Sequence, residues 1–380
     1  MTTTLSVIVD PILWPATGGI GRYTEELTRE LIATAPAGCE VAAISSAASA
    51  EDREKIETLL PGIARLNAGR LPHAARSLAW RYGFGKITGR GMVHSTSLFA
   101  PLSNHDRINH ERDQLVVTIH DVIAWTDPGT LNPRRVAWMK AMTSRAHRFA
   151  DAIIAPSHAV ASELGEIMNF GDRIRVIGGA VSPKLQLPVD EDDRAERLGL
   201  PRDYVLSVGT LEPRKGLEAL IQSFARADAV DLPLLIVGPE GWGDVDIAAI
   251  AAEAGLAEGR VRTLGFLADA DLAVALNRAR VFAFPSVAEG FGLSVVEAFN
   301  FGTPVVHSDA PALLEVAAGA GLIVEREDSA GYPDRLASAI ARVVNDRALA
   351  DRLHVAGLDR AGAFSWRDSA EKVWHLHADL

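Results

Sequence analysis

The sequence has little of several features that mark particular classes of protein. Its 380 residues include one cysteine, Cys39, so no disulfide framework can form and a reducing compartment is expected. No apolar run approaches the roughly 20 residues that span a bilayer, and Met1–Asp10 has neither a basic leader nor a small-residue cleavage site. We therefore expect a cytoplasmic protein whose contact with the inner face of the cell membrane, if any, is peripheral.

Acidic residues are scarce in part of the first half of the chain. Residues 1–186 carry 20 basic and 18 acidic side chains, whereas residues 187–380 carry 18 basic and 31 acidic ones. The net charge of the whole chain, −11, argues against nucleic-acid binding. No acid lies between Glu57 and Asp106, where basic and apolar residues alternate: Arg65, Arg70, Arg76, Arg81, Lys86 and Arg90 with Leu66, Leu71, Leu78, Trp80, Tyr82 and Phe84. This Arg65–Arg90 segment fits either solvated helix faces or a surface for an anionic membrane or a phosphate-bearing acceptor.

Short β-branched and apolar runs recur along the chain, and most are followed by a stretch with helical periodicity. The expected strands are Leu5–Asp10, Glu40–Ser45, Met92–Ser95, Leu115–Asp121, Ala152–Ser157, Ile174–Gly179, Tyr204–Gly209, Pro233–Gly238, Val261–Phe266, Val281–Ser286, Pro304–Asp309 and Gly321–Glu325. The alternation and the length predict an α/β protein with two doubly wound parallel-sheet domains. Ser182–Asp193, which has prolines and an acidic end, is the expected linker.

The loop after the expected strand Val281–Ser286 is the most informative part of the sequence. Gly290 and Gly292 open a helix whose free amides can face an anion. Glu289 precedes the helix and can reach a sugar hydroxyl, while Glu297 within it can accept hydrogen bonds from a ribose diol. The alternative is structural: Glu289 caps the helix and Glu297 lies on the surface.

A second motif follows the first strand of the second domain, where Gly209 leads to Arg214, Lys215 and Gly216. Two cations at a strand end can neutralise a diphosphate leaving group as its charge develops. Such a turn by itself is most often a surface loop. Its occurrence in the same domain as the Glu289 motif favours the functional interpretation.

The first domain carries two weaker signals. Gly18, Gly19 and Gly21 cluster after the first strand and permit close approach of the backbone to a ligand, without the dinucleotide fingerprint. His120 and Asp121 end another expected strand, so they point at the same sheet edge. A strand-end histidine is more often structural than catalytic, and its role depends on its neighbours.

No metal site is expected. His105, His110 and Glu111 lack zinc-type spacing, and so do His375 and His377. The acidic run Asp190–Asp193 lies in the expected linker, where a solvated charge run is the better interpretation. Trp242 follows a strand and is interpreted as a core residue rather than as part of a nucleotide-base site.

At these residues the chain resembles the retaining glycosyltransferases of family four, which have the GT-B fold of two facing Rossmann-like domains. EGFGLSVVEAFNFGTPVV is similar to the Glu-x7-Glu signature of that family, GTLEPRKG to its donor-diphosphate motif and GGIGRY to its N-terminal glycine loop. TIHD, VHSTSLFAP and Phe364-Ser365-Trp366 also resemble family segments. The resemblance implies an acceptor-binding domain over 1–185, a donor-binding domain over 193–360 and a C-terminal helix, 361–380, that crosses back to the first domain.

The resemblance also implies roles for individual residues. Glu289 and the amides of Gly290, Phe291, Gly292 and Leu293 would hold the donor sugar and its phosphates, with Glu297 on the ribose. Arg214 and Lys215 would hold the diphosphate, and His120 would contact the sugar near its reacting face; Gly19 and Gly209 would approach the donor closely. The family's front-face mechanism needs no metal or other cofactor, and the leaving phosphate takes the proton of the acceptor hydroxyl.

The resemblance is less specific about the donor and the acceptor. GTLEPRK is closest in wording to bacterial enzymes that move mannose or related deoxyhexoses in polysaccharide and glycolipid assembly, which favours GDP-mannose and a glycan or lipid-linked acceptor; UDP-, dTDP- and ADP-sugars are the alternatives. Many relatives have Asn at Gly216, a basic residue near Pro239-Glu240, or an arginine at Thr210, so this corner departs from the pattern.

Two other functions fit the same architecture. A sugar-nucleotide epimerase would act on free donor, and a phosphorylase would need a pyridoxal lysine that the sequence does not place. A two-lobed sugar-binding protein without chemistry would ordinarily carry a secretion signal and would need no Arg214-Lys215 pair.

Overall fold

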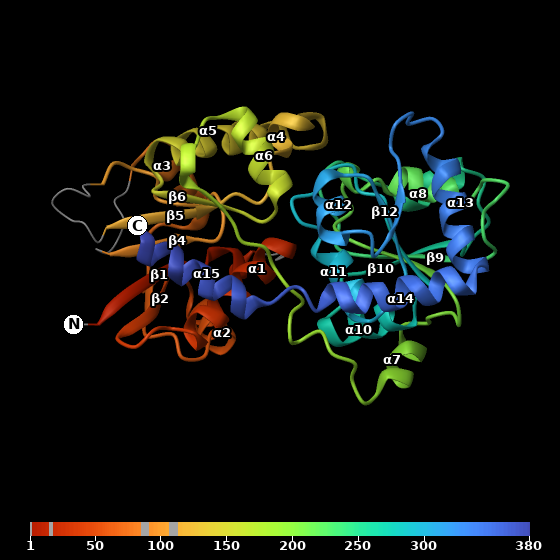
Figure 1. The fold of residues 1–380 in the computed structure, drawn as a ribbon, viewed down its shortest axis with the longest axis horizontal. Coiled ribbons are helices and arrows are strands. Elements are labelled where there is room, and N and C mark those ends of the chain that lie inside the picture. The colour runs from red at the N-terminus through yellow and green to blue at the C-terminus, as the bar shows by residue number, and fades with distance from the viewer. Residues whose placement is uncertain (1, 15–17, 85–90, 106–112) are drawn as a thin grey trace. The chain divides into compact units, whose positions relative to one another are not determined.

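The structure is a computed structural model that describes residues 2–14, 18–84, 91–105 and 113–380 (Figure 1). The chain forms two compact units. The first takes its described residues from 1–128, 133–179 and 365–380, and the second comprises 129–132 and 180–364. Among the described residues, no helix is long and apolar enough to cross a membrane.

The first unit is built on a parallel sheet. Its described strands lie in the order β3 (Leu66–Ala68), β2 (Cys39–Ser45), β1 (Thr3–Ile8), β4 (Met92–Ser95), β5 (Gln114–Thr118), β6 (Ala152–Ala155) and β7 (Ile174–Val176). The chain runs outward from β1 to β3 and then returns to β4, so the order reverses between β1 and β4. Ligands bind at such a switch point, beyond the carboxyl ends of the strands.

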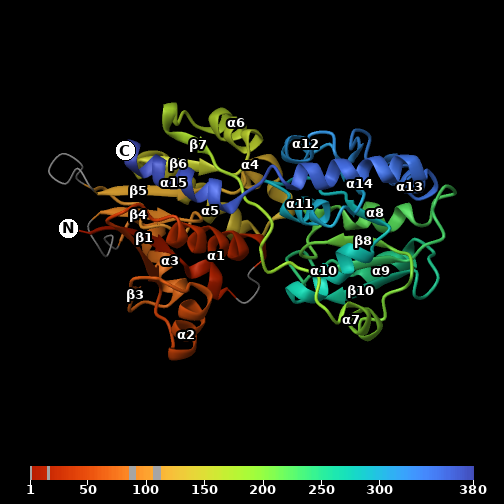
Figure 2. The same cartoon turned by 60° about the horizontal axis from the view of Figure 1, so that its bottom comes forward.

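The helices of the first unit connect these strands. The described helices are α1 (Gly18–Ala33), α2 (Ala50–Leu59), α3 (His73–Arg81), α4 (Ile123–Thr126), α5 (Pro133–Phe149), α6 (His158–Ile167) and α15 (Trp366–Asp379), with the 3-10 turns η1 (Asp10–Leu13) and η3 (Gly171–Arg173). A further 3-10 turn, η2 (Pro128–Thr130), has its last two residues in the second unit. Although α15 is the last helix of the chain, it lies beside α1 (Figures 1 and 2), and Trp374 donates to the Leu31 carbonyl at 3.2 Å. Ser365 caps this helix by accepting from the Asp368 amide.

The second unit repeats the plan. Its described strands lie in the order β10 (Val261–Gly265), β9 (Leu234–Val237), β8 (Val205–Val208), β11 (Val281–Phe284), β12 (Val305–Ser308) and β13 (Leu322–Val324), all parallel, with the reversal between β8 and β11. Its helices are α7 (Glu191–Arg197), α8 (Leu217–Ser223), α9 (Ile247–Glu253), α10 (Asp269–Arg278), α11 (Leu293–Asn300), α12 (Pro311–Ala317), α13 (Tyr332–Asn345) and α14 (Arg347–Ala361), with the 3-10 turn η4 (Pro213–Lys215).

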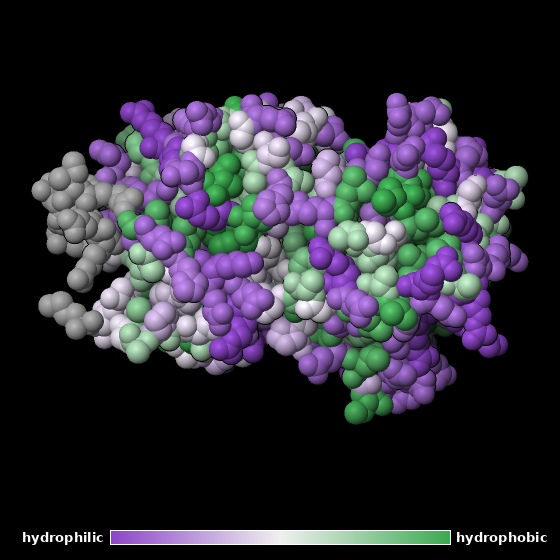
Figure 3. Space-filling view, in the orientation of Figure 1, coloured by the Kyte–Doolittle hydropathy of each residue, from purple (hydrophilic) through white to green (hydrophobic). Residues whose placement is uncertain are grey.

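Both faces of the second sheet are covered. Leu234 and Ile236 of β9 pack into a core with residues of α8, α9 and α13, whereas Leu235 and Val237 pack into another core with residues of α10, α11 and α12. This alternation explains why the strands read as continuous apolar runs, since residues on both faces are buried. In the view of Figure 3, hydrophilic residues cover most of the described surface and hydrophobic ones form separate patches.

The structure confirms the predicted α/β class with two doubly wound parallel sheets, and each of the twelve expected strands is present. It adds β3, which the sequence did not suggest because its three residues are all only partly buried. The expected linker is wrong at its end. The helix α7 begins at Glu191, within that expected linker. The acids of Asp190–Asp193 are nevertheless solvated as predicted: Asp192 and Asp193 are exposed, although Asp192 is bonded to Arg278 and Arg194 is bonded to Asp190 at 2.8 Å. Acids in a first helical turn also favour the helix through its dipole.

Candidate active site

The two motifs of the second domain meet at its switch point. Lys215 ends the 3-10 turn that follows β8, and Glu289 lies in the loop that follows β11. Because β8 and β11 are parallel neighbours, their carboxyl ends lie side by side, and residues that are 74 positions apart in the sequence come into contact.

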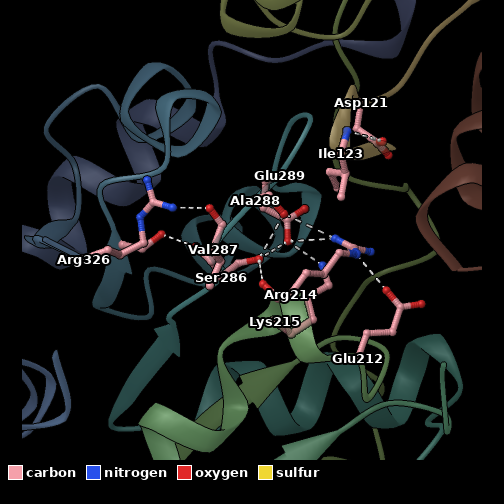
Figure 4. Close-up of polar contacts among 11 residues, drawn as sticks. Asp121, Ile123, Glu212, Arg214, Lys215, Ser286, Val287, Ala288, Glu289 and Arg326 are labelled. Atoms are coloured by element: carbon pink, nitrogen blue, oxygen red, sulfur yellow. Dashed lines mark hydrogen bonds and ion pairs between the residues drawn. The ribbon is translucent and has the colours of Figure 1, made fainter. Parts of the chain in front are cut away.

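Three side chains converge on the Glu289 carboxylate (Figure 4). Lys215 Nζ lies 2.5 Å from Glu289 Oε1, and Arg214 Nη1 lies 3.5 Å from the same oxygen. The Ser286 hydroxyl donates to this oxygen at 2.6 Å, while Glu212 holds Arg214 through a 2.7 Å contact with Nε. The exposed fractions of the Lys215 and Glu289 side chains are 12% and 9%, so the ion pair is largely removed from water.

This arrangement sets the ionisation of Glu289. Burial by itself would raise the pKa of the carboxyl, but the charges of Lys215 and Arg214 and the hydrogen bonds from Lys215 and Ser286 outweigh it, and the pKa lies below its usual value. Burial lowers the pKa of Lys215, with Glu289 offsetting part of that effect. The site therefore holds a carboxylate against two cations that an incoming anion can also bind.

The backbone near Lys215 explains the glycines of the motif. Gly216 has φ +67°, and a Cβ there would lie 2.3 Å from the Pro285 carbonyl oxygen, so no larger residue fits without a shift. Gly209 lies under the Lys215 side chain, where a Cβ would make ordinary contacts of 3.5 Å. Glycine at position 216 thus has a physical reason in the close packing of the two strand ends.

The helix after Glu289 has the expected glycine start. Gly292 precedes α11 with φ +89°, and a Cβ there would lie 2.4 Å from Leu313 Cδ2. No side chain caps α11, so Glu289 is not a capping residue. Glu297 is 4% exposed and therefore not a surface residue. Leu293 is the first residue of this helix, Gly290 lies in the loop, and Phe291 packs edge-on against Phe364 at 5.5 Å.

His120 follows β5 in the first unit and is held from two sides. Its Nε2 lies 2.8 Å from the Thr96 carbonyl oxygen, so Nε2 carries the hydrogen and Nδ1 is the nitrogen with a lone pair. Tyr23 packs edge-on against the ring at 4.8 Å. Burial lowers the pKa of His120, and the Thr96 carbonyl and Asp121 only partly offset this, which favours a neutral imidazole that can accept a hydroxyl hydrogen.

The first-domain glycines open α1, where Gly18 has φ +46°. No described atom lies within 4 Å of the Cβ that Gly19 would carry, so packing among the described residues does not require glycine there.

Trp242 is 38% exposed in the loop after β9, so its interpretation as a core residue is wrong. No three His, Cys, Asp or Glu side chains within the described ranges lie close enough together to hold a metal ion; His110 and Glu111 are outside those ranges.

Comparisons with known proteins match the whole architecture. The model of Glycosyltransferase Family 4 matches residues 17–185, and that of Glycosyl transferases group 1 matches residues 189–359. O-antigen chain mannosyltransferase B of Escherichia coli is 30% identical over 94% of this chain and 95% of its own length.

The chain belongs to the family 4 glycosyltransferases. It is therefore an enzyme that transfers a sugar. D-inositol 3-phosphate glycosyltransferase 1 of Catenulispora acidiphila is 26% identical over 97% of this chain and 93% of its own length. Among solved structures, Anabaena HepE in complex with UDP and glucose superposes with a TM-score of 0.75 at 18% identity, covering 100% of both chains, which shows the GT-B fold.

Sequence reasoning missed several residues that shape the Glu289 site of this glycosyltransferase. Ser286 is the last residue of the expected strand and gave no signal of its own, although its hydroxyl contacts Glu289. Arg326 follows β13, and its guanidinium donates to the Val287 carbonyl, two residues before Glu289 (Figure 4). Asp309, after β12, lies 2.5 Å from Arg326 Nε. These residues lie at successive strand ends, which was the only available clue.

Arg326 is expected to position the Glu289 loop. Replacing it by alanine releases the Val287 carbonyl, so Arg326→Ala should lower kcat about tenfold, because small displacements of a catalytic group are costly. The donor KM and the melting temperature should change much less. Arg262→Ala is the matched control, since Arg262 also donates to a backbone carbonyl, that of Gly199 at 2.8 Å, and not to Val287. Equal kinetics in the two variants would contradict the positioning role.

Proposed function

We propose that the protein is a retaining mannosyltransferase that transfers mannose from GDP-mannose to a glycan or lipid-linked acceptor in polysaccharide assembly. The observation that carries the proposal is the 30% identity to O-antigen chain mannosyltransferase B over 94% of the chain. In the reaction, the bond between the sugar anomeric carbon and the diphosphate oxygen breaks, and the bond to the acceptor oxygen forms on the same face. The acceptor proton passes to the departing phosphate oxygen.

The geometry at the switch point of the second unit supports this chemistry. Arg214 and Lys215 are two cations at one strand end, and they would bind the diphosphate as its charge grows. Glu289 would then accept hydrogen bonds from sugar hydroxyls, with the amides of Gly290 to Leu293 on the phosphates. Glu297 would bind the ribose, and Gly209 and Gly19 would approach the donor closely.

The same charges support transfer without a metal. A metal ion in nucleotide-sugar chemistry neutralises the departing diphosphate, and Arg214 and Lys215 already supply two positive charges at this position. His120, neutral and with Nδ1 as its lone-pair nitrogen, is suited to accept a hydrogen bond from a sugar hydroxyl near the reacting carbon.

The donor is tested by thermal shift. GDP-mannose at saturating concentration should raise the melting temperature more than UDP-glucose, dTDP-glucose or ADP-glucose, since ligand that binds the folded state stabilises it.

The product formed on a mannose-terminated oligosaccharide should have the anomeric configuration of the donor by NMR, and EDTA should leave the initial rate unchanged. Inversion, restoration of an EDTA-inhibited rate by Mg²⁺, or a greater shift with another sugar nucleotide would each contradict the corresponding part of the proposal.

We also propose that part of the Arg65–Arg90 segment binds an anionic membrane surface. Leu71, Leu78, Tyr82 and Phe84 are 47%, 57%, 62% and 70% exposed around α3. Not all of its basic residues are free for lipid: Arg76 is buried and donates to the Ser45 carbonyl at 2.7 Å, and Arg65 lies 3.6 Å from Glu40. Lys86 and Arg90 lie outside the described residues.

Membrane binding is tested with vesicles. The protein should sediment with vesicles that contain phosphatidylglycerol at low salt, and the variant with Leu78→Ser and Phe84→Ser should lose at least half of that binding, since exposed apolar side chains insert at the interface. Val355→Ser is the control, because Val355 is an equally exposed apolar residue on α14 of the second unit. Retention of the double variant at wild-type level would refute the assignment of this surface.

A further inference from the structure

The carboxyl edge of the first sheet carries a group of side chains to which no role has been given. Four neighbouring strands, β3, β2, β1 and β4, end at this edge. One member of the group follows each of them: His73, Ser46, Asp10 and Phe99, in the same order. Parallel strands bring their carboxyl ends together, so these residues meet although they are distant in sequence.

Asp10 is the buried member of the group. Its side chain is 3% exposed, and its two oxygens accept from the Ser46 amide at 3.0 and 3.2 Å. One of them, Oδ1, also lies 3.6 Å from His73 Nδ1, which is close enough for electrostatic attraction but too long for a hydrogen bond. A carboxylate so placed costs free energy of desolvation, and a neighbouring hydrogen-bond donor lowers that cost.

His73 is the exposed member, and aromatic rings fix its orientation. Its ring stacks on Phe99 with centroids 4.3 Å apart, and Trp14 meets it edge-on at 5.9 Å. Trp80 supports Phe99 from behind at 4.4 Å. The His73 side chain is 45% exposed, and with Nδ1 nearest to Asp10, Nε2 is left at the other end of the ring. An exposed imidazole held in one orientation by three groups is arranged for contact with a ligand.

Trp14 supplies a second, independent observation. Its Nε1 is a buried donor for which the described residues provide no acceptor. Buried donors ordinarily have a hydrogen-bond partner. The exposed imidazole, set among aromatic rings at the sheet edge, offers the polar group and the apolar surroundings that a sugar ring needs.

We propose that Asp10, His73 and Trp14 form a subsite for a neutral, hydroxyl-rich sugar ring of the acceptor, in which Asp10 and Trp14 orient His73 and His73 Nε2 is hydrogen-bonded to a hydroxyl group of the sugar. The inference rests on the proposed transferase function and adds the class of acceptor group. A neutral ring is favoured over a phosphate because the Asp10 carboxylate would repel an anion. The nearby cation, Arg76, is already bonded to the Ser45 carbonyl.

The experiment compares the full-length protein with His73→Gln, Asp10→Asn and the control His375→Gln, which changes an exposed histidine on α15 of the same unit. Methyl α-D-mannopyranoside and methyl α-D-glucopyranoside serve as probes in saturation-transfer NMR. Transfer to mannose-terminated oligosaccharides and hydrolysis of the donor by water are measured in parallel. His73 is exposed, so His73→Gln keeps the test valid if Asp10→Asn fails to fold.

The expected result is a rise of about tenfold in the acceptor KM for His73→Gln, the loss of about one hydrogen bond. The donor KM and the rate of donor hydrolysis should stay at the wild-type values, and His375→Gln should behave as wild type. Unchanged acceptor KM in His73→Gln and Asp10→Asn, or displacement of a bound glycoside by inorganic phosphate, would overturn the subsite. Donor hydrolysis does not involve the acceptor, so it separates the two proposals; wild-type protein that neither transfers sugar to any oligosaccharide nor hydrolyses the donor would instead contradict the proposed function.

Discussion

Replacing Glu289 by glutamine is expected to slow sugar transfer by about 10²- to 10³-fold while tightening the binding of the nucleoside diphosphate product by about tenfold. The rate falls because an ionised acceptor of sugar hydroxyls is lost. In the wild-type protein, Glu289 forms an ion pair with Lys215 at 2.5 Å, and an incoming diphosphate has to compete with Glu289 for this lysine. Product binding therefore tightens when the carboxylate is removed. Glutamine removes the competing charge and keeps the size of the side chain.

Lys215→Met is the complementary change. Methionine keeps the aliphatic part of the side chain, which contacts the Gly209 position, but removes the ammonium group. Transfer should fall by a similar factor, and here product binding should weaken by more than tenfold, since one of two diphosphate cations is gone. The opposite signs of the two product affinities distinguish competition for Lys215 from a general loss of structure.

Both variants are measured by steady-state kinetics and by titration calorimetry with GDP. Glu218→Gln is the control, because Glu218 is a carboxylate on the neighbouring helix α8 that contacts Gln222 at 3.1 Å and lies in an exposed position. Weaker GDP binding in Glu289→Gln would show that Glu289 does not compete with the diphosphate.

The free energy of unfolding without ligand should also fall by about 3 kcal/mol in Glu289→Gln, since two cations lose their buried counter-charge.

The Glu289 site shows what could be predicted from the sequence. Apolar runs marked β8 and β11, and parallel neighbours share a carboxyl edge, so Arg214, Lys215 and Glu289 were placed in one domain with related roles. Their contact in the structure follows from the strand order, which the sequence does not state. That order depends on packing between distant segments, and it is also what brings Arg326 to the Glu289 loop.

Local composition was misleading where tertiary contacts decided the outcome. Arg76 belonged to an apparently exposed basic run, yet it is buried with its guanidinium on the Ser45 carbonyl. The strand β3 has no apolar run, because it lies at the edge of its sheet and its residues are only half-buried. Glu191 to Asp193 were expected to belong to a linker, but they form the first turn of α7, where they stay largely solvated and where Arg278 of α10 pairs with Glu191 and Asp192.

A buried histidine in the first unit should make the protein sensitive to acid. His94 lies within β4 with an exposed fraction of 0%, and neither ring nitrogen has a hydrogen-bond partner among the described residues. Its ring is 5.8 Å from that of His377 on α15. Burial lowers the pKa of His94 to about 3, and burial together with the nearby His94 lowers the pKa of His377 well below its usual value.

These directions fix the sign of the pH dependence. Below about pH 6.5 an unfolded histidine binds a proton that the folded protein excludes, so the free energy of unfolding falls as the pH falls, by about 1.4 kcal/mol per pH unit for each such histidine. For His94 this loss continues down to its folded pKa of about 3. At pH 5 the exclusion of a proton from His94 should therefore lower the free energy of unfolding by about 2 kcal/mol relative to its value above pH 6.5.

His94→Leu should remove this cost. Leucine is close to histidine in volume and leaves no unpartnered nitrogen in the core, so stability at pH 7.5 should be equal or greater. At pH 5 the free energy of unfolding should be higher in the variant than in wild type, and this difference should be about 2 kcal/mol larger than the difference at pH 7.5. Urea denaturation followed by circular dichroism and tryptophan fluorescence at pH 7.5, 6.5, 5.5 and 5.0 measures the difference, with His375→Gln as the exposed control. Parallel pH profiles for wild type and His94→Leu would mean that His94 is protonated in the folded protein, and the acid sensitivity would then have to come from other groups.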